Sequence, residues 1–202
     1  MTERLHLGSG TVYLTGYINV DLPGDMTFLA SEHPELVEAY RTTEDAYYAR
    51  SPGYKTMSDF PEQALSGTQP YLCDRYGSWF NIPCRSGNAN EILSRATFEH
   101  LSLTESHRAL DEAGRVLCPG GLLRLSVPDH ETCLRKFVES GDKVWIRQLL
   151  GPRTSEGGYH LVGYTLASLR AVVEKHGFTF VGEEENPHAY PMLCCRWKKA
   201  VR

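Results

Sequence analysis

The stretch EILSRATFEHLSLTESHRALDEAGRVLCPGGLLRLSVPD, residues 91–129, decides the fold of this chain. Its two apolar runs, 91–96 and 122–127, are typical of buried strands, and the residues between them show helical spacing. An acid–base pair, Glu99 and His100, follows the first run. The pattern predicts a β-α-β unit with polar groups at the strand ends, where open α/β sheets bind their ligands.

The helix inside this unit has well-marked ends. Ser102 and Glu105 form the S-x-x-E pattern of a capping box, and Pro-Gly-Gly at 119–121 is expected to end the helix. Five residues at helical spacing form the expected buried face: Leu103, His107, Leu110, Ala113 and Leu117.

The sequence on either side extends this unit into one α/β domain over residues 1–202. We expect strands at 4–7, 17–21, 71–74 (an edge strand), 178–182 and 192–197, and helices over 131–150, with a break at Gly141, and from the cap Thr165 to Gly177. This order predicts a Rossmann-like, mostly parallel sheet flanked by helices, whose last two strands form an antiparallel hairpin.

A polar, tyrosine-rich segment at about 23–70 interrupts this pattern. Residues 35–48 are expected to be helical, with Pro34 at a first-turn position. The segment is too long for a plain connection, so we predict a helical insertion or lid. Its tyrosines either cap the site or pack the insertion onto the sheet: Tyr40, Tyr47, Tyr48 and Tyr54.

Bulk composition disfavours several classes of protein. A formal charge of −4 and a pI near 6.1 give no electrostatic footprint for nucleic acid. No apolar run approaches the roughly 20 residues that span a bilayer, and no apolar leader precedes the first strand. The 6 cysteines show no CxxC spacing. We therefore expect a cytoplasmic protein with reduced thiols and neither nucleic-acid nor membrane partners.

The glycine turn after the first strand, Gly8-Ser9-Gly10, indicates close approach of a ligand to the backbone. A dinucleotide fingerprint would need a third glycine where this chain has Tyr13, and a ribose-binding acid about 20 residues on, whereas Asp21 comes sooner. NAD is therefore disfavoured, and no P-loop is present.

Two blocks resemble the small class I (type 11-like) S-adenosylmethionine-dependent methyltransferases. RLHLGSGTVYLTGYINVD, residues 4–21, is similar to a first motif reading LNLGCG and then GWINVD; FEHL, RVLxPGG and LSVPD are similar to the fourth and fifth motifs. The resemblance covers about 4–22 and 71–182. It implies transfer of a methyl group from S-adenosylmethionine to an O or N atom of a small-molecule acceptor, such as a sugar or another secondary metabolite.

The resemblance also implies a set of cofactor-binding residues. The glycines would face the amino acid part of the cofactor, Asp21 the ribose hydroxyls, Leu22 the adenine face and Asp74 the adenine amine. The alternative for Asp21 is a plain turn-forming aspartate before Pro23. The full expected set is Leu7, Gly8, Gly10, Asp21, Leu22 and Asp74.

Two departures from the family pattern keep other functions open. Residues 11–16 are too few for a crossover helix, so a loop is expected there. Ala96 stands where the family often has histidine. The alternatives are a non-catalytic binding or assembly subunit with the same fold, or a different enzyme using the same cofactor. A monomer and a homodimer are both compatible with the sequence.

Methyl transfer from a sulfonium is a positioning task, to which a hydroxyl or amine acceptor adds the need for a base. The expected catalytic residues are Glu99, His100 and His160, with Asp129 as a further candidate. Because Glu99 and His100 are adjacent, we expect one to face the site and the other to support the helix start. No two histidines stand at metal-ligand spacing with a supporting acid, so the sequence predicts no catalytic metal.

Overall fold

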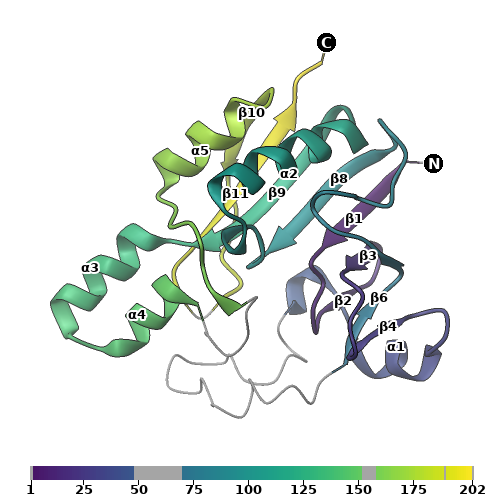
Figure 1. Cartoon of the computed structure of the whole chain (residues 1–202), viewed down its shortest axis with the longest axis horizontal. Helices are drawn as coiled ribbons and strands as arrows, with labels where there is room; N and C mark the ends of the chain where they lie inside the picture. The colour runs from purple at the N-terminus through teal and green to yellow at the C-terminus, as the bar shows by residue number, and fades with distance from the viewer. Residues whose placement is uncertain (1, 48–69, 152–157, 189, 202) are drawn as a thin grey trace.

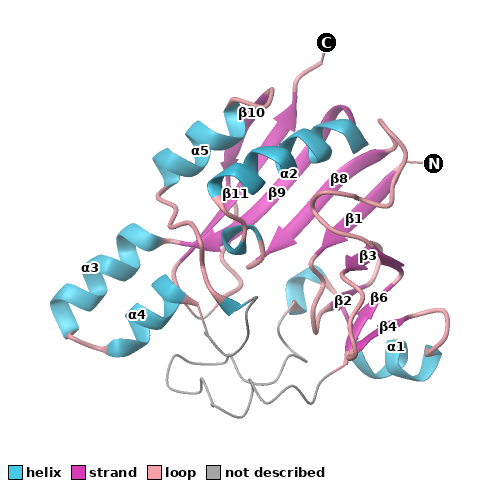
Figure 2. Cartoon of the chain, in the orientation of Figure 1, coloured by secondary structure: helices cyan, strands magenta, loops and turns pink. Residues whose placement is uncertain are grey.

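The computed structural model of the chain describes residues 2–47, 70–151, 158–188 and 190–201. Its centre is a seven-stranded sheet of order β7-β3-β1-β8-β9-β11-β10 (Figures 1 and 2). The strands are β1 (Glu3–Leu7), β3 (Ile18–Asp21), β7 (Arg75–Tyr76), β8 (Ala89–Arg95), β9 (Leu117–Pro128), β10 (Phe178–Glu183) and β11 (Met192–Lys199).

The sheet is parallel except at its closing strands. All pairings from β7 through β3, β1 and β8 to β9 are parallel, whereas β11 runs antiparallel to both β9 and β10. The predicted Rossmann-like sheet with an antiparallel closing pair is therefore confirmed. As a consequence, the carboxyl ends of β1, β3, β8 and β9 lie along one edge of the sheet, where ligands bind in this architecture.

Helices α2 (Leu103–Val116) and α5 (Leu166–Glu174) cover one face of the sheet in Figure 1. Apolar side chains of both helices and of the central strands form the main core on this face, including Leu5, Leu7, Ile92, Leu110, Leu123, Leu125 and Leu169. Burial of this apolar surface is the main driving force for the layered arrangement.

The helix starts follow the predicted signals. Ser102 caps α2 through the predicted capping box, and Thr165 caps α5. Helices α3 (His130–Ser140) and α4 (Lys143–Leu150) are separated at Gly141, whose φ of 68° is the left-handed conformation that glycine adopts readily. The predicted break is therefore confirmed.

The end and the buried face of α2 differ from the prediction. The helix stops at Val116, and Leu117 begins β9 directly. Leu103 is 51% exposed, and His107 is half-buried with its Nδ1 2.8 Å from Nε2 of His176 in the turn after α5. Leu110 and Ala113 of the predicted face are confirmed as buried. The other buried residues of the helix are Ser106, Ala109 and Val116.

The Pro-Gly-Gly sequence lies inside β9 and not in a loop after the helix. The pairing of β9 with β8 changes register there: Ala89 pairs with Leu117, but Glu91 pairs with Leu122. Residues 118–121 therefore bulge out against the single residue 90. A proline, which lacks an N–H, is tolerated at such a bulge.

The segment after β3 is helical only in part. Helix α1 (Pro34–Tyr40) begins at the predicted proline, but Arg41–Thr42 forms strand β5, which pairs with β2 (Tyr13–Leu14). The helix predicted over 35–48 was therefore wrong beyond residue 40. Two successive threonines favour an extended backbone at this point, and the pairing with β2 stabilises it.

The strand predicted at 71–74 joins a small second sheet. Strand β6 (Tyr71–Cys73) pairs in parallel with β4 (Thr27–Leu29). The edge position of the main sheet is taken by β7, which follows at once and pairs with β3. The edge strand of the main sheet thus lies a few residues further along the chain than predicted.

The second face of the sheet is covered by the chain between β1 and residue 47. Residues 8–17 hold β2 and no helix, as their short spacing predicted. Tyr47 is 4% exposed and packs in a second core cluster with Val12, Leu14, Tyr17 and Leu93. For Tyr47 the packing role is therefore confirmed; Tyr40 is half-buried, and Tyr48 and Tyr54 lie outside the described residues.

An ion-pair network fastens the same segment to the sheet. Arg124 of β9 contacts Glu44 of the short 3-10 helix η1 (Glu44–Ala46) at 2.6 Å and Glu91 of β8 at 2.8 Å. It also contacts Glu184 at 2.8 Å. Among the described helices, none is long and apolar enough to cross a bilayer.

Candidate functional site

The turn after β1 has a geometry that glycine alone fits. Gly8 donates its N–H to the carbonyl of Val20 at 2.9 Å and has a φ of 67°. A Cβ on Gly8 would collide with the Thr97 side chain, which follows β8. Gly10 also has a positive φ, of 54°, but a Cβ there would meet no atom within 4 Å. The turn is therefore tight on its inner side and open on its outer side.

Asp21, at the end of β3, lies against this turn. The N–H of Gly10 donates to Oδ2 at 2.5 Å, and the N–H of Leu22 donates to Oδ1 at 2.8 Å. Burial raises the pKa of Asp21, while these backbone donors act in the opposite direction. Each oxygen keeps capacity to accept another hydrogen bond, so the carboxylate is held in one orientation and can still bind hydroxyl donors. Leu22 is 59% exposed beside it.

Asp74 braces the protein itself. One oxygen accepts from the hydroxyl of Tyr13 at 2.7 Å, and the other accepts from the backbone N–H and the side-chain amide of Asn19 at 2.7 and 3.1 Å. The residue thus ties β3 to the chain just before β7. Contact with an adenine amine remains a prediction for Asp74.

Glu99 lies in the 3-10 helix η4 (Phe98–His100), directly after β8. Its side chain is 1% exposed, and neither carboxylate oxygen has a hydrogen-bond partner among the described residues. Burial raises the pKa of this carboxyl to about 8, opposed by its own backbone N–H. A buried acid in this condition is a common mark of a functional site.

His160 approaches Glu99 from the loop before α5. Its Nδ1 lies 2.9 Å from the carbonyl of Gln148, at the end of α4, and its Nε2 lies 4.0 Å from Oε1 of Glu99. Gly151 lets this loop come close, because a Cβ there would collide with the carbonyl of Gly158. Burial, and then the neighbouring His100, lower the pKa of His160 to about 4, so its ring is neutral at pH 7.

His100 completes the group. Its Nδ1 lies 2.9 Å from the carbonyl of Tyr159, and its ring meets that of His160 edge to face with centroids 4.9 Å apart. The fold therefore brings together all three predicted catalytic residues, and one donor atom from each lies within 4.8 Å of the others. Both Glu99 and His100, in the 3-10 turn, lie near His160, and a supporting role for one of them at the start of α2 stays a prediction.

Asp129, the further candidate, has a different environment. Its carboxylate accepts hydrogen bonds from the backbone N–H of Thr132 at 3.1 Å and from its hydroxyl at 2.6 Å. It is thus the N-cap of α3.

Two residues directly after β8 also shape the site. Thr97, which the sequence did not single out, holds β8 against the glycine turn, bonds Ser94 and accepts from Nε1 of Trp79 at 3.4 Å. Its place directly after a buried strand was the only signal available in the sequence. Ala96, singled out above as a departure from the family pattern, has a φ of 54°, which is uncommon for a residue other than glycine.

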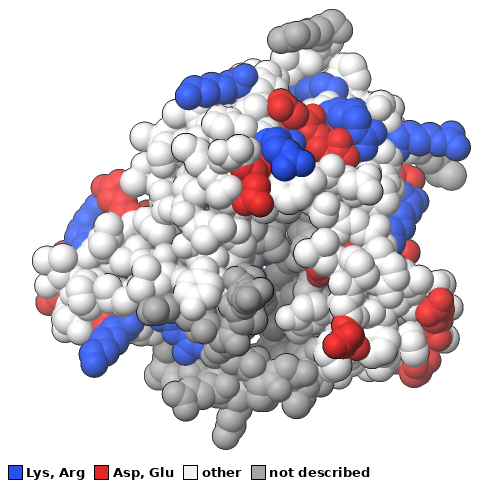
Figure 3. All heavy atoms as spheres, in the orientation of Figure 1, with Lys and Arg blue, Asp and Glu red and all other residues white. Residues whose placement is uncertain are grey.

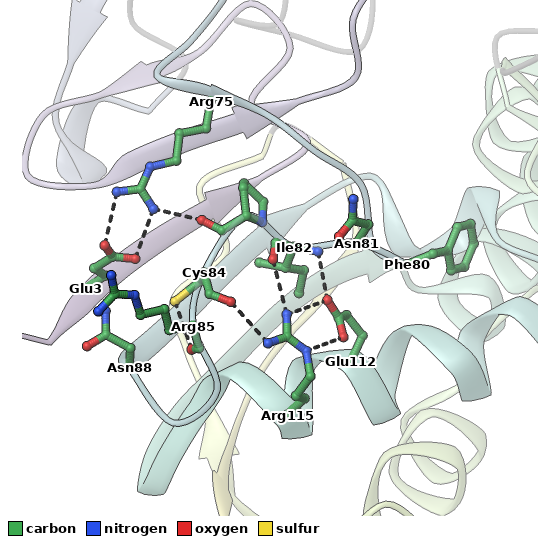
Figure 4. A pocket seen from close by; sticks show the side chains of 11 residues that line it. Glu3, Arg75, Phe80, Asn81, Ile82, Cys84, Arg85, Asn88, Glu112 and Arg115 are labelled. Atoms are coloured by element: carbon green, nitrogen blue, oxygen red, sulfur yellow. Dashed lines mark hydrogen bonds and ion pairs between the residues drawn. The ribbon is translucent and has the colours of Figure 1, made fainter.

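A cleft of about 930 Å³ lies at the opposite end of the sheet (Figure 4). Four of its charged residues form two ion pairs: Arg75 lies 3.0 Å from Glu3, and Arg115 lies 2.6 Å from Glu112. Arg115 also donates to the carbonyl of Cys84 at 3.1 Å. These charges are engaged in holding the turns together, so the carboxyl edge is the better candidate for a functional site.

No protein-family model and no curated protein match the sequence. Solved structures do. An S-adenosylmethionine-dependent methyltransferase from Methanosarcina mazei aligns with a TM-score of 0.55 and 18% identity, over 100% of this chain and 93% of that one. The apo S-adenosylmethionine-dependent methyltransferase SibL aligns with a TM-score of 0.54 and 14% identity, over 98% of this chain and 51% of that one. A protein from Pyrococcus horikoshii OT3 aligns with a TM-score of 0.52 and 12% identity, over 98% of this chain and 82% of that one.

At identities of 12–18%, these structural alignments show the fold alone. The chain has the Rossmann-like fold of class I S-adenosylmethionine-dependent methyltransferases, and the resemblance drawn from its motifs is confirmed at that level.

Proposed function

We propose that this protein is an S-adenosylmethionine-dependent methyltransferase that acts on an O or N atom of a small molecule. The main support is Asp21, whose carboxylate is held over the glycine turn by the N–H of Gly10 at the carboxyl edge of the sheet. A carboxylate in this position can accept both hydroxyls of a ribose. In this proposal Leu7, Gly8 and Gly10 lie along the amino acid part of the cofactor, Leu22 lies against the adenine, and Asp74 is near its amine.

S-adenosylmethionine would supply an already activated methyl group on its sulfonium. The task left to the chain is to orient the acceptor, exclude water and receive a proton. Glu99, His100 and His160 are the proposed catalytic group, because two half-buried histidines gather around the buried Glu99 on the carboxyl side of the sheet. The formal charge of −4 gives no basic excess for nucleic acid and is consistent with a small-molecule acceptor; on the face shown in Figure 3, basic and acidic side chains are interspersed.

Calorimetric titration of the full chain with S-adenosylmethionine and S-adenosylhomocysteine tests this proposal. Asp21→Asn is expected to weaken binding roughly tenfold to a hundredfold, since a charged hydrogen bond contributes about 1.5–3 kcal/mol. Asp25→Asn removes an exposed carboxylate from the same loop and is expected to bind normally. Failure of the native chain to bind either compound at high micromolar concentration would refute the proposal.

A non-catalytic binding or assembly subunit is the second candidate. It is favoured by Ala96, which occupies with a positive φ the position where the family often has histidine. The two functions are separated by a screen of sugar, phenol and amine acceptors that follows release of S-adenosylhomocysteine. Acceptor-dependent release supports the enzyme, whereas cofactor binding without release across the screen supports the subunit.

A further inference from the structure

The cluster of Glu99, His100 and His160 contains a carboxylate that accepts no hydrogen bond from the described residues. Both oxygens of Glu99 are buried and have no hydrogen-bond partner among the described residues. A buried polar group without a partner costs about 1–3 kcal/mol, and a buried charge costs more. Such an arrangement is understandable when the group serves something that binds to it.

Both histidines of the cluster direct Nδ1 at a backbone carbonyl. A backbone carbonyl can only accept a hydrogen bond, so Nδ1 of His160 must donate to Gln148 and Nδ1 of His100 must donate to Tyr159. An imidazole held in this way has its lone pair on Nε2 when the ring is neutral, and Nε2 of His160 is the atom that lies 4.0 Å from Glu99 Oε1. In metal sites, ligating histidines are oriented in this way, with the other ring N–H donated to a carbonyl or a carboxylate.

We propose that Glu99, His100 and His160 bind a divalent transition-metal ion of the Zn²⁺ or Fe²⁺ type. Two imidazoles and one carboxylate form the ligand set that these ions take when positions are left open for water or substrate. Hard ions such as Mg²⁺ prefer oxygen ligands and are disfavoured here. This inference departs from the sequence-based prediction of no metal, which considered spacing along the chain; His160 is brought to the pair by folding.

The ligand atoms need only a small movement to surround an ion. They lie within 4.8 Å of one another, and His160 Nε2 is 4.0 Å from Glu99 Oε1. Ligands at about 2.1 Å from one ion are about 3–3.5 Å apart, so capture draws them together by roughly an ångström. Side-chain rotation of Glu99 and a small shift of the loop carrying His160 are sufficient.

An ion at this place would extend the function proposed above. It would bind an acceptor hydroxyl directly and lower the pKa of that hydroxyl, so that the three side chains act through the metal. This catalytic role of the ion rests on the proposed methyl transfer, whereas binding of the metal itself does not.

Metal binding by the tag-free full chain provides the test. Calorimetry with Zn²⁺ and absorption spectroscopy with Co²⁺ are expected to show one site, with visible d–d bands and no sulfur charge-transfer band from the 6 cysteines. Glu99→Gln and His160→Gln are each expected to weaken Zn²⁺ binding at least a hundredfold. Excess Mg²⁺ is expected to leave the bound Co²⁺ spectrum unchanged.

The matched control lies on the other side of α2. His176→Gln alters a second histidine pair, in which Nε2 of His176 is 2.8 Å from His107 and Nδ1 is 2.7 Å from Asp111. This variant is expected to bind Zn²⁺ as the native chain does. The proposal is overturned by equal Zn²⁺ affinity in native and Glu99→Gln protein, by selective loss in His176→Gln, or by a thiolate band in the Co²⁺ spectrum.

Two further outcomes are decisive. Should the Glu99 and His160 variants fail to fold, the Co²⁺ spectrum of the native chain still distinguishes nitrogen–oxygen ligands from thiolates, and a chain without a Co²⁺ site refutes the inference. Zinc binding without cofactor binding would retain the metal site and reject the methyltransferase, whereas cofactor binding without zinc binding would do the reverse.

Discussion

The two ends of the sheet use charged groups in opposite ways. At the amino end, Arg75 and Arg115 are paired with Glu3 and Glu112 and reach backbone carbonyls of the nearby turns (Figure 4). At the carboxyl end, Glu99 is buried with no hydrogen-bond partner among the described residues. The amino end has a cleft of about 930 Å³, yet these lining charges pair with one another. An unsatisfied buried group is therefore a better guide to function here than a cleft lined by paired charges.

The largest effect is expected from a comparison of two glycines that have the same φ angle. Gly8, at the carboxyl end, and Gly87, at the amino end, both have a φ of 67°, but only at Gly8 would a Cβ collide with a neighbour, Thr97. Gly87→Ala is expected to cost about 1 kcal/mol of unfolding free energy from backbone strain alone. Gly8→Ala is expected to cost about 3 kcal/mol or more and to abolish cofactor binding.

Urea unfolding and calorimetry measure both effects, and Thr97→Ser provides a second step. Removing the methyl group of Thr97 is expected to recover part of the stability lost in Gly8→Ala. Equal costs for the two alanine variants would show that the close approach at Gly8 contributes nothing.

The next largest effect concerns His6, which lies on β1 between the two ends. It is fully buried, bonds Asn19 at 3.0 Å and Tyr47 at 2.6 Å, and burial lowers its pKa to about 4. The unfolded chain takes up this proton near pH 6.5, so the contribution of His6 is complete above that pH. It is lost as the pH falls toward 4, by about 3 kcal/mol in all.

Unfolding free energies at pH 7.5, 6 and 5 check this expectation. His6→Gln is expected to reduce the loss of stability over this range, at some cost in stability at pH 7.5. An unchanged pH dependence in the variant would assign the acid sensitivity to other buried groups.

A smaller effect is expected at the amino end. Arg115→Gln breaks a pair whose arginine is 38% exposed, so the cost is expected to be about 1 kcal/mol or less. Binding of S-adenosylmethionine and of Zn²⁺ is expected to be unchanged, because the variant lies at the opposite end of β8 from Glu99. A tenfold loss of either affinity would contradict the division of the sheet into a bracing end and a binding end.

The smallest expected effect has the opposite sign. Ala96→Gly relieves the strain of a positive φ directly after β8, which stabilises the fold by about 1–2 kcal/mol. It also raises the entropy of the unfolded chain, which opposes folding by about 0.4–1 kcal/mol. A net gain in stability of about 0.5 kcal/mol is therefore expected. Thermal unfolding measures it. A loss of stability would mean that the methyl group of Ala96 makes packing contacts worth more than the backbone strain.

Local signals carried most of the fold. The Ser102 cap, the Gly141 break and the Thr165 cap act within a few residues, and each is where the sequence indicated. The errors arose where pairing with a distant strand outweighs local preference. Residues 41–42 leave the expected helix to pair with β2, and the Pro-Gly-Gly sequence becomes a bulge of β9 beside β8.

The candidate site shows the same division. Asp21 follows the glycine turn by few residues, and its contact with Gly10 agrees with the motif. The approach of His160 to Glu99 depends on the end of α4, the loop after Gly151 and the 3-10 turn after β8 together. Spacing along the chain does not predict a contact between residues that folding brings together. The three residues of the cluster could therefore be predicted from the sequence, but a shared metal ion could not.

The lack of a helix between β1 and β3 limits how this protein can be shortened. In place of a helix, the chain from Val12 to Tyr47 shields Leu93 on that face of the sheet, and Glu44 neutralises Arg124 beneath it. A shortened variant without this segment would expose a hydrophobic patch on the sheet to solvent and is expected to self-associate. The segment is a structural layer of the domain, and redesign for a new acceptor has to retain it.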